Sequence, residues 1–180
     1  MNDKPSLRAA ARARRDSFVA TAPPPVDSPP AFAALLRPGL VVASYAPIGS
    51  EADPRLLEAT ALAHGCVLAL PHVVDRATPL RFLRWHADVP LAAGPFGLRQ
   101  PSPSPDALAP DVVLTPLVAF DRRLNRIGQG AGHYDRAFAH FPHAIRIGVA
   151  WSVQELPAIA ADAWDMPLHA IATEQEWITL

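Results

Sequence analysis

The sequence predicts an α/β fold: a single-domain three-layer sandwich with a mostly parallel central sheet and helices on both faces. Apolar runs of strand length alternate with helical segments along the chain, which is typical of this class. Between residues 40 and 71 a strand, a helix and a strand follow one another, and this βαβ order needs parallel strands. The length of 180 residues suits one domain over 1–180.

The chain begins with an expected helix at 1–20, because good helix formers dominate there. Leu7, Ala11 and Phe18 recur at helical spacing and can face a core. A proline-rich connector at 21–38 follows, which we expect to be stiff and extended rather than folded.

A second stripe of the same helix is basic. It consists of Lys4, Arg8, Arg12 and Arg15, at intervals of three or four residues. Taken alone, this pattern favours a solvated basic face.

The remaining elements are expected in a regular order. Strands are predicted at 40–45, 66–71, 79–85, 111–120, 145–151 and 169–174, with 79–85 at an edge and 111–120 fully buried. Helices are predicted at 54–64, after the cap residue Asp53, and near 133–141. A second proline-rich stretch at 100–110 is expected to be extended.

Composition excludes several classes of protein. A formal net charge of -1 argues against nucleic-acid binding, and no apolar run approaches the length of a membrane span. The single cysteine, Cys66, cannot form an internal disulfide, which favours the cytoplasm. The Ala- and Arg-rich start is compatible with a transit-type signal, but Asp3, Asp16 and the lack of serine enrichment argue against it.

The most informative stretch is "NRIGQGAGHYDRAF" at 125–138, where Gly128, Gly130 and Gly132 alternate between an expected buried strand and a helix. Ligands of open α/β sheets bind at this kind of position, beyond a strand end and at a helix N-terminus. Alternating glycines let successive N–H groups face an anion closely. The pattern is neither a Walker motif nor a Rossmann fingerprint.

Two charged residues flank this loop. Arg126 supplies positive charge to an anion, while Asp135 stands where the helix begins. A carboxylate beside a phosphate is repulsive unless a cation lies between them, which points to Mg²⁺. The alternative is a tight structural turn in which Asp135 is only a helix cap or first-turn acid.

Several separated segments resemble the 5-formyltetrahydrofolate cyclo-ligase (5,10-methenyltetrahydrofolate synthetase) family. The stretch from Arg126 to Asp135 is similar to its ATP loop, "KPSLR" to its N-terminal ATP-contacting motif, and "YAPIGSEAD" to its folate segment. Four further segments and the C-terminal "WDMPLHAIATEQEWI" follow the family order.

The resemblance implies an enzyme that uses ATP and Mg²⁺ to convert 5-formyltetrahydrofolate to 5,10-methenyltetrahydrofolate through a phosphorylated formyl intermediate. It implies Arg126 and Asp135 as catalytic residues and Asp135 with Asp165 as metal ligands. The implied ATP-binding residues are Lys4, Arg8, Arg126, Gly128, Gln129, Gly130, Ala131, Gly132, His133 and Tyr134. The implied substrate-binding residues are Ala46, Glu51, His133 and Tyr134. We expect a monomer or weak homodimer with small-molecule partners. We also expect the Asp135→Asn protein to have near-normal stability.

The sequence departs from the family pattern at a few positions. His133 stands where Tyr is usual, Ala131 where some members carry Lys, Gln100 where Glu is usual, and Ala46 where some members carry a larger apolar residue. Two alternatives stay open. One is an ATP-dependent paralogue acting on another formyl or formimino substrate; the other is a non-catalytic nucleotide- or folate-binding module.

Overall fold

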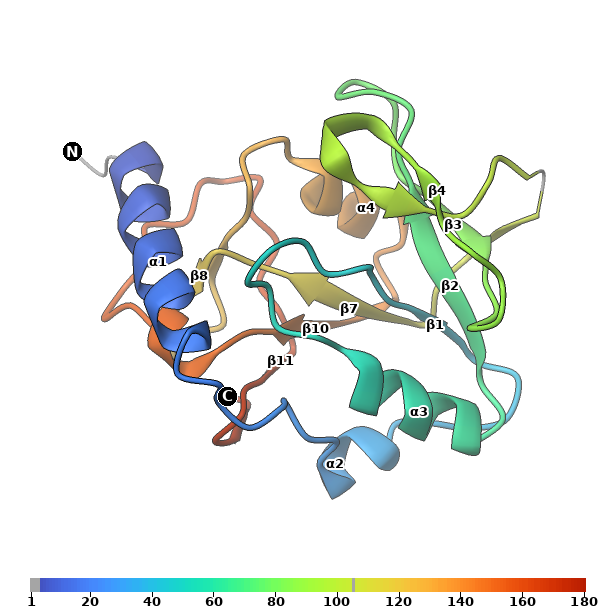
Figure 1. Cartoon of the computed structure of the whole chain (residues 1–180), viewed down its shortest axis with the longest axis horizontal. Coiled ribbons are helices and arrows are strands. Elements are labelled where there is room, and N and C mark those ends of the chain that lie inside the picture. Colours follow the sequence, from blue (N-terminus) through green and yellow to red (C-terminus); the bar gives the residue numbers. More distant parts are fainter. Residues whose placement is uncertain (1–3, 105) are drawn as a thin grey trace.

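The computed structural model describes residues 4–104 and 106–180 and contains an eight-stranded sheet with helices on both faces (Figure 1). Residues 1–3 of the expected N-terminal helix and residue 105 of the second proline-rich stretch lie outside this description. The helices are α1 (Lys4–Val19), α2 (Pro30–Ala33), α3 (Arg55–Ala63) and α4 (His133–His140). The strands are β1 (Val41–Ala43), β2 (Val67–His72), β3 (Arg81–Arg84), β4 (Ala92–Ala93), β5 (Arg99–Gln100), β6 (Ala107–Leu108), β7 (Val112–Pro116), β8 (Ala119–Phe120), β9 (Arg126–Ile127), β10 (Ile145–Val149), β11 (Ala170–Ala172) and β12 (Trp177–Ile178).

The strands of the main sheet are arranged in the order β12-β11-β10-β7-β1-β2-β3-β6. The five central strands, β11 to β2 in this order, run parallel, and β12, β3 and β6 pair antiparallel at the two sides. The predicted mostly parallel sheet is therefore confirmed. The strand expected at an edge, β3, lies one place inside it because the short β6 pairs with it.

Successive residues of the central strands point to opposite faces, and each face buries its own core. Val42 and Leu114 pack on one side with residues of α2 and α3, such as Phe32 and Leu57. On the other side, the sheet packs against α4, whose fully buried Phe138 is part of the second core. Figure 1 shows α2 and α3 below the sheet and α4 above it, which gives the three predicted layers.

The connector at 21–38 is not the extended spacer that its prolines suggested. It contains the short helix α2, and Val26, Phe32 and Leu36 are buried in the core beside α3. Prolines start the helix and stiffen its approach, while the three apolar residues anchor the segment by burial.

The strand predicted at 111–120 is shorter than expected. β7 ends at Pro116, and residues 119–127 form a separate hairpin of β8 and β9. The carboxylate of Asp121 accepts the backbone N–H groups of Arg123 and Asn125, both at 3.0 Å, and this fixes the turn. The apolar run is continuous because both β7 and the hairpin are buried, so the run alone does not reveal the break.

Candidate active site

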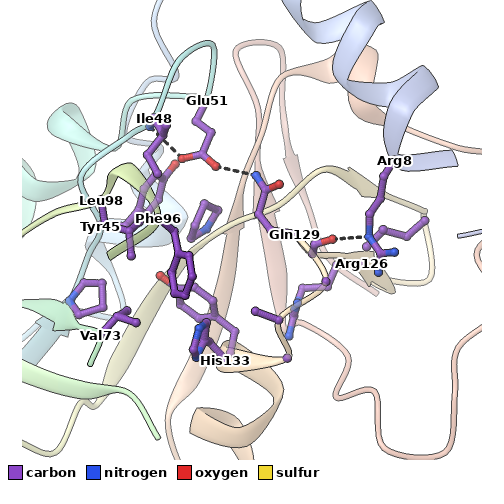
Figure 2. A pocket seen from close by; sticks show the side chains of 18 of the residues that line it. Arg8, Tyr45, Ile48, Glu51, Val73, Phe96, Leu98, Arg126, Gln129 and His133 are labelled. Carbon is purple, nitrogen blue, oxygen red and sulfur yellow. Dashed lines mark hydrogen bonds between the residues drawn. The ribbon is translucent and has the colours of Figure 1, made fainter. Parts of the chain in front are cut away.

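A cavity of about 770 Å³ opens at the carboxyl ends of β1, β2 and β7. Tyr45, Val73 and Pro116, which lie at or just beyond these strand ends, line it. The glycine loop and α1 form its other walls, and Figure 2 shows labelled lining residues from α1, from the glycine loop and from beyond β1 and β2. Ligands of parallel α/β sheets bind at this edge, and the cavity has the size of a small-molecule site.

The hairpin of β8 and β9 presents the glycine loop to the cavity. Gly130 has φ +105° and Gly132 has φ +67°, conformations that residues with a side chain rarely adopt. Gly132 is also the N-cap of α4 and provides no side-chain cap, so the first-turn N–H groups of this helix are left to a ligand or solvent. An anion is favoured at such a helix start.

Arg126 and Asp135 form an ion pair beside this loop. The Arg126 Nη2 donates to Asp135 Oδ1 at 2.6 Å, and the Arg126 side chain is 5% exposed against 25% for Asp135. The guanidinium also lies 5.0 Å from the ring centroid of Phe138. Burial lowers the pKa of Arg126, and the charge of Asp135 opposes this shift. Because Gly132 is the N-cap, Asp135 is not the helix cap; it is the first-turn acid that the same alternative also allowed, and it is held by an arginine.

The basic stripe of α1 faces the cavity rather than solvent. Leu7 and Ala11 pack against Ile127 and neighbouring residues, which lays the helix against the hairpin. Arg8 then reaches the glycine loop, where its Nε donates to the Gly128 carbonyl at 2.9 Å (Figure 2). The solvated-face interpretation is therefore wrong, because α1 packs on the hairpin and turns its basic side chains toward the cavity. The sequence of the helix alone does not reveal this contact.

Lys4, at the start of α1, points to a pair of carboxylates. Its Nζ lies 2.5 Å from Asp162 Oδ2 and 3.1 Å from Asp165 Oδ2. Burial lowers the pKa of Lys4, but hydrogen bonds to the two carboxylates outweigh it, so the pKa is raised. Sequence reasoning singled out Asp165 and missed Asp162, which is set apart only by this contact.

Asp135 and Asp165 line the same cavity, 30 positions apart in the chain. No group of three or more His, Cys, Asp or Glu residues able to hold a metal occurs among residues 4–104 and 106–180. The two carboxylates of Asp135 and Asp165 fit Mg²⁺, which is commonly bound through one or two carboxylates together with substrate phosphates rather than by an all-protein cage.

The opposite side of the cavity is more apolar. Tyr45, Val73, Phe96 and Leu98 line it, and Figure 2 shows them across the cavity from Arg8. Phe96 is 59% exposed and has φ +59°, and the Arg76 guanidinium lies 5.3 Å from its ring centroid. Sequence reasoning missed Phe96, although an aromatic residue next to a glycine beyond a strand was a usable signal.

Known proteins are similar to this chain in sequence and in fold. The model of the 5-formyltetrahydrofolate cyclo-ligase family matches residues 32–174. The chain belongs to this family. The matched range contains the glycine loop, Glu51 and Asp165, whereas Lys4 and Arg8 precede it.

Individual relatives agree with the family match. The chain is 33% identical to the 5-formyltetrahydrofolate cyclo-ligase of Mycolicibacterium smegmatis over 148 residues, 78% of this chain and 76% of the other. It is 36% identical to that of Haemophilus influenzae over 98 residues, and this match spans 51% of this chain and about half, 52%, of the relative's length.

A solved 5,10-methenyltetrahydrofolate synthetase of Aquifex aeolicus shares the fold with a TM-score of 0.74 at 28% identity, covering 98% of this chain and 92% of the other. A synthetase of Mycoplasma pneumoniae, at 22% identity and a TM-score of 0.66, supports the fold alone. Among the described residues, no helix has the length and apolar character needed to cross a membrane.

The departures from the cyclo-ligase pattern have distinct surroundings. Gln100 is buried, and its amide accepts the Val73 N–H at 2.9 Å and donates to the Val73 carbonyl at 3.1 Å. A carboxylate could not donate the second bond, so the glutamine is suited to hold β5 beside the end of β2. Ala46 and Ala131 line the cavity without adding charge.

His133 lines the cavity, and its Nδ1 lies 3.1 Å from Nη2 of Arg136. Burial and the charge of Arg136 lower the pKa of His133, which favours the neutral ring. Tyr134 follows it and packs against Phe138, and burial raises the pKa of its phenol.

Proposed function

We propose that this protein converts 5-formyltetrahydrofolate and ATP to 5,10-methenyltetrahydrofolate, ADP and phosphate with Mg²⁺. One observation carries the proposal: a single cavity brings the glycine loop, Arg8 and Arg126 opposite the Glu51 loop and an apolar wall. The first group suits the phosphates of ATP, and the second suits a flat, largely apolar ring system with polar edges.

The residues supply position and charge rather than a nucleophile. In the proposed reaction the formyl oxygen takes the γ-phosphoryl group of ATP, N10 attacks the activated carbon, and phosphate leaves as the ring closes. Arg126 suits the phosphoryl oxygens because Asp135 and Phe138 hold its guanidinium in place. Lys4 and Arg8 add positive charge from α1, and such transfer depends mainly on positioning and charge neutralisation.

Asp135 and Asp165 would hold the magnesium ion, which when bound neutralises charge on phosphate oxygens. The Asp135 Oδ1 is already engaged by Arg126, and the Asp165 Oδ2 by Lys4. Each carboxylate has a second oxygen to offer, so the ion pairs orient these ligands without blocking them.

We also propose that residues 1–180 form one cyclo-ligase-like domain that works in the cytoplasm as a monomer or weak homodimer. The single cysteine, which cannot form an internal disulfide, supports the cytoplasmic part of this proposal.

The activity is tested by the absorbance of 5,10-methenyltetrahydrofolate formed from 5-formyltetrahydrofolate, ATP and Mg²⁺. Product should form only when all three are present, in equal amount to ADP. Nucleotide hydrolysis without this product would favour a different substrate, and binding of both ligands without turnover would favour a binding module.

Gly130→Val is expected to stay folded and to weaken nucleotide binding by about tenfold or more, a loss of about 1.4 kcal/mol. The native φ of +105° is strained for valine, and a Cβ there would lie 3.6 Å from the Arg8 guanidinium carbon. Titration with a non-hydrolysable ATP analogue measures the effect. Gly39→Val is the matched control, because Gly39 has φ +86° and a Cβ added there would meet no atom within 4 Å. Equal affinity of the Gly130→Val and parent proteins would contradict a nucleotide loop.

Glu51→Gln is expected to raise the Kd for 5-formyltetrahydrofolate alone by about tenfold, while the Kd for the ATP analogue alone changes little. Glu51 accepts hydrogen bonds from the Ile48 N–H and from Gln129, both at 3.0 Å, so an amide would turn a donor toward one of these donors. Separate binding titrations of the two ligands check this. Equal losses for both would indicate that Glu51 only maintains the loop.

A further inference from the structure

One side chain joins the glycine loop to the Glu51 loop. The Gln129 Nε2 donates to Glu51 Oε1 at 3.0 Å across the cavity (Figure 2). The other end of the same amide, Gln129 Oε1, accepts from Arg12 Nη2 at 2.5 Å. Gln129 therefore contacts a residue of the proposed substrate side and a residue of α1 at the same time.

The bridge completes the fixation of the Glu51 carboxylate. Its Oε2 accepts the Ile48 N–H at 3.0 Å, and its Oε1 accepts the Gln129 amide at 3.0 Å. With both oxygens held, the plane of the carboxylate is set relative to the cavity. Each oxygen has a second lone pair for a ligand donor, so the bridge can persist when substrate binds.

The Glu51 loop is also fastened directly to α1. Arg15 Nε donates to Ser50 Oγ at 2.8 Å, Ser50 Oγ donates to Asp16, and Trp151 Nε1 donates to the Ser50 carbonyl at 3.0 Å. Arg15 is only 6% exposed, whereas Ser50 is half-buried and Asp16 is exposed, so the anchor is buried on the Arg15 side alone. Helix α1 thus contacts the Glu51 loop through Ser50 and the glycine loop through Arg8 and Gln129.

We propose that Gln129 is a positioning residue that couples binding of the nucleotide to binding of the folate. The inference rests on the proposed function. A nucleotide that orders the glycine loop also places the Gln129 amide against Glu51, so the folate meets a carboxylate that is already oriented. By linkage, a folate that fixes Glu51 favours the nucleotide-binding arrangement of the loop by the same factor. The entropy cost of ordering the glycine loop and Glu51 is then met once, whichever of the two ligands binds first.

Glutamine suits this role chemically. Its amide donates to a carboxylate and accepts from a guanidinium, two charge-assisted hydrogen bonds that neither an acid nor an apolar side chain can make together. Methionine has nearly the same length and fills the same space, but it offers no donor to Glu51. Gln129→Met therefore separates hydrogen bonding from packing.

The experiment measures the Kd of a non-hydrolysable ATP analogue with Mg²⁺, in the absence and presence of saturating 5-formyltetrahydrofolate. The ratio of the two values is the coupling factor, in which a change common to both measurements cancels. We expect a factor of at least about 5 for the parent protein. For Gln129→Met and Gln129→Ala we expect the factor to fall below about 2, and the reciprocal titration should give the same values.

Gln175→Ala is the matched control, because Gln175 is exposed and does not line the cavity. Its coupling factor should equal that of the parent. A parent factor of one, or an undiminished factor in Gln129→Met, would overturn the inference while leaving the proposed function intact. A parent protein that fails to bind 5-formyltetrahydrofolate at all would overturn the proposed function, and the coupling with it.

Discussion

Asp135→Asn is expected to lower kcat by about 100-fold and to raise the Mg²⁺ concentration needed for half-maximal rate. The substitution removes a charged ligand oxygen from the proposed metal site and weakens the group that orients Arg126. Initial rates measured over a Mg²⁺ titration test this. An Asn variant that turns over at the parent rate with the parent Mg²⁺ dependence would exclude Asp135 as a metal ligand.

The ion pair changes the stability expected for the same variant. Sequence reasoning predicts near-normal stability, because asparagine keeps the shape of aspartate. In the structure, however, asparagine would leave the 5% exposed guanidinium of Arg126 without its anion. Losing a hydrogen-bonded charge partner costs about 2 kcal/mol, which corresponds to a fall of about 4–8 °C in Tm for a chain of this length. Thermal unfolding without ligands measures it.

Arg126→Met is expected to lower kcat by about 1000-fold, the effect typical of removing an arginine from a phosphoryl-transfer site. Its stability should change much less than that of Asp135→Asn. Methionine can pack on Phe138 in place of the guanidinium, and the carboxylate left behind is 25% exposed and can be hydrated. The same rate assay and thermal unfolding measure both effects.

Arg146→Met provides the matched control. The Arg146 guanidinium lies 5.7 Å from the centroid of the same Phe138 ring, but Arg146 does not line the cavity. Its loss should lower stability, because its Nε donates to the Pro167 carbonyl at 2.8 Å, and should leave kcat within a few-fold of the parent.

The double variant Asp135→Asn/Arg126→Met tests whether the unpaired charge of Arg126 causes the loss of stability. If the uncompensated charge of Arg126 destabilises Asp135→Asn, adding Arg126→Met should raise the Tm of that variant. A double variant that is no more stable than Asp135→Asn alone would show that the buried charge is not the cause.

Much of the fold follows from local sequence patterns. The β1–α3–β2 unit was predicted within one or two residues of its bounds, because apolar strands, a proline near the helix start and Gly65 each act over a few residues. The N-cap is Pro54 and not the predicted Asp53, although the Asp53 carboxylate accepts the Arg55 N–H at 3.0 Å. The position of α4 and the glycine loop before it were also predicted, since glycine alternation is a local backbone signal. The two-residue strands β6 and β12 were missed, because they exist only through pairing with β3 and β11.

The candidate site also has features that follow from the sequence and others that depend on tertiary contacts. The sequence by itself determined the glycine loop, the candidate charged residues and the family. Only the tertiary structure decided that Arg126 pairs with Asp135, that Lys4 contacts Asp162 as well as Asp165, and that the basic stripe of α1 faces a cavity. Residues such as Glu51 and Gln129, 78 positions apart, meet because sheet register and the packing of α1 bring their loops together. Hydrogen bonds of that kind require separate elements to be placed to within a few tenths of an ångström, whereas periodicity and propensity act only along the chain.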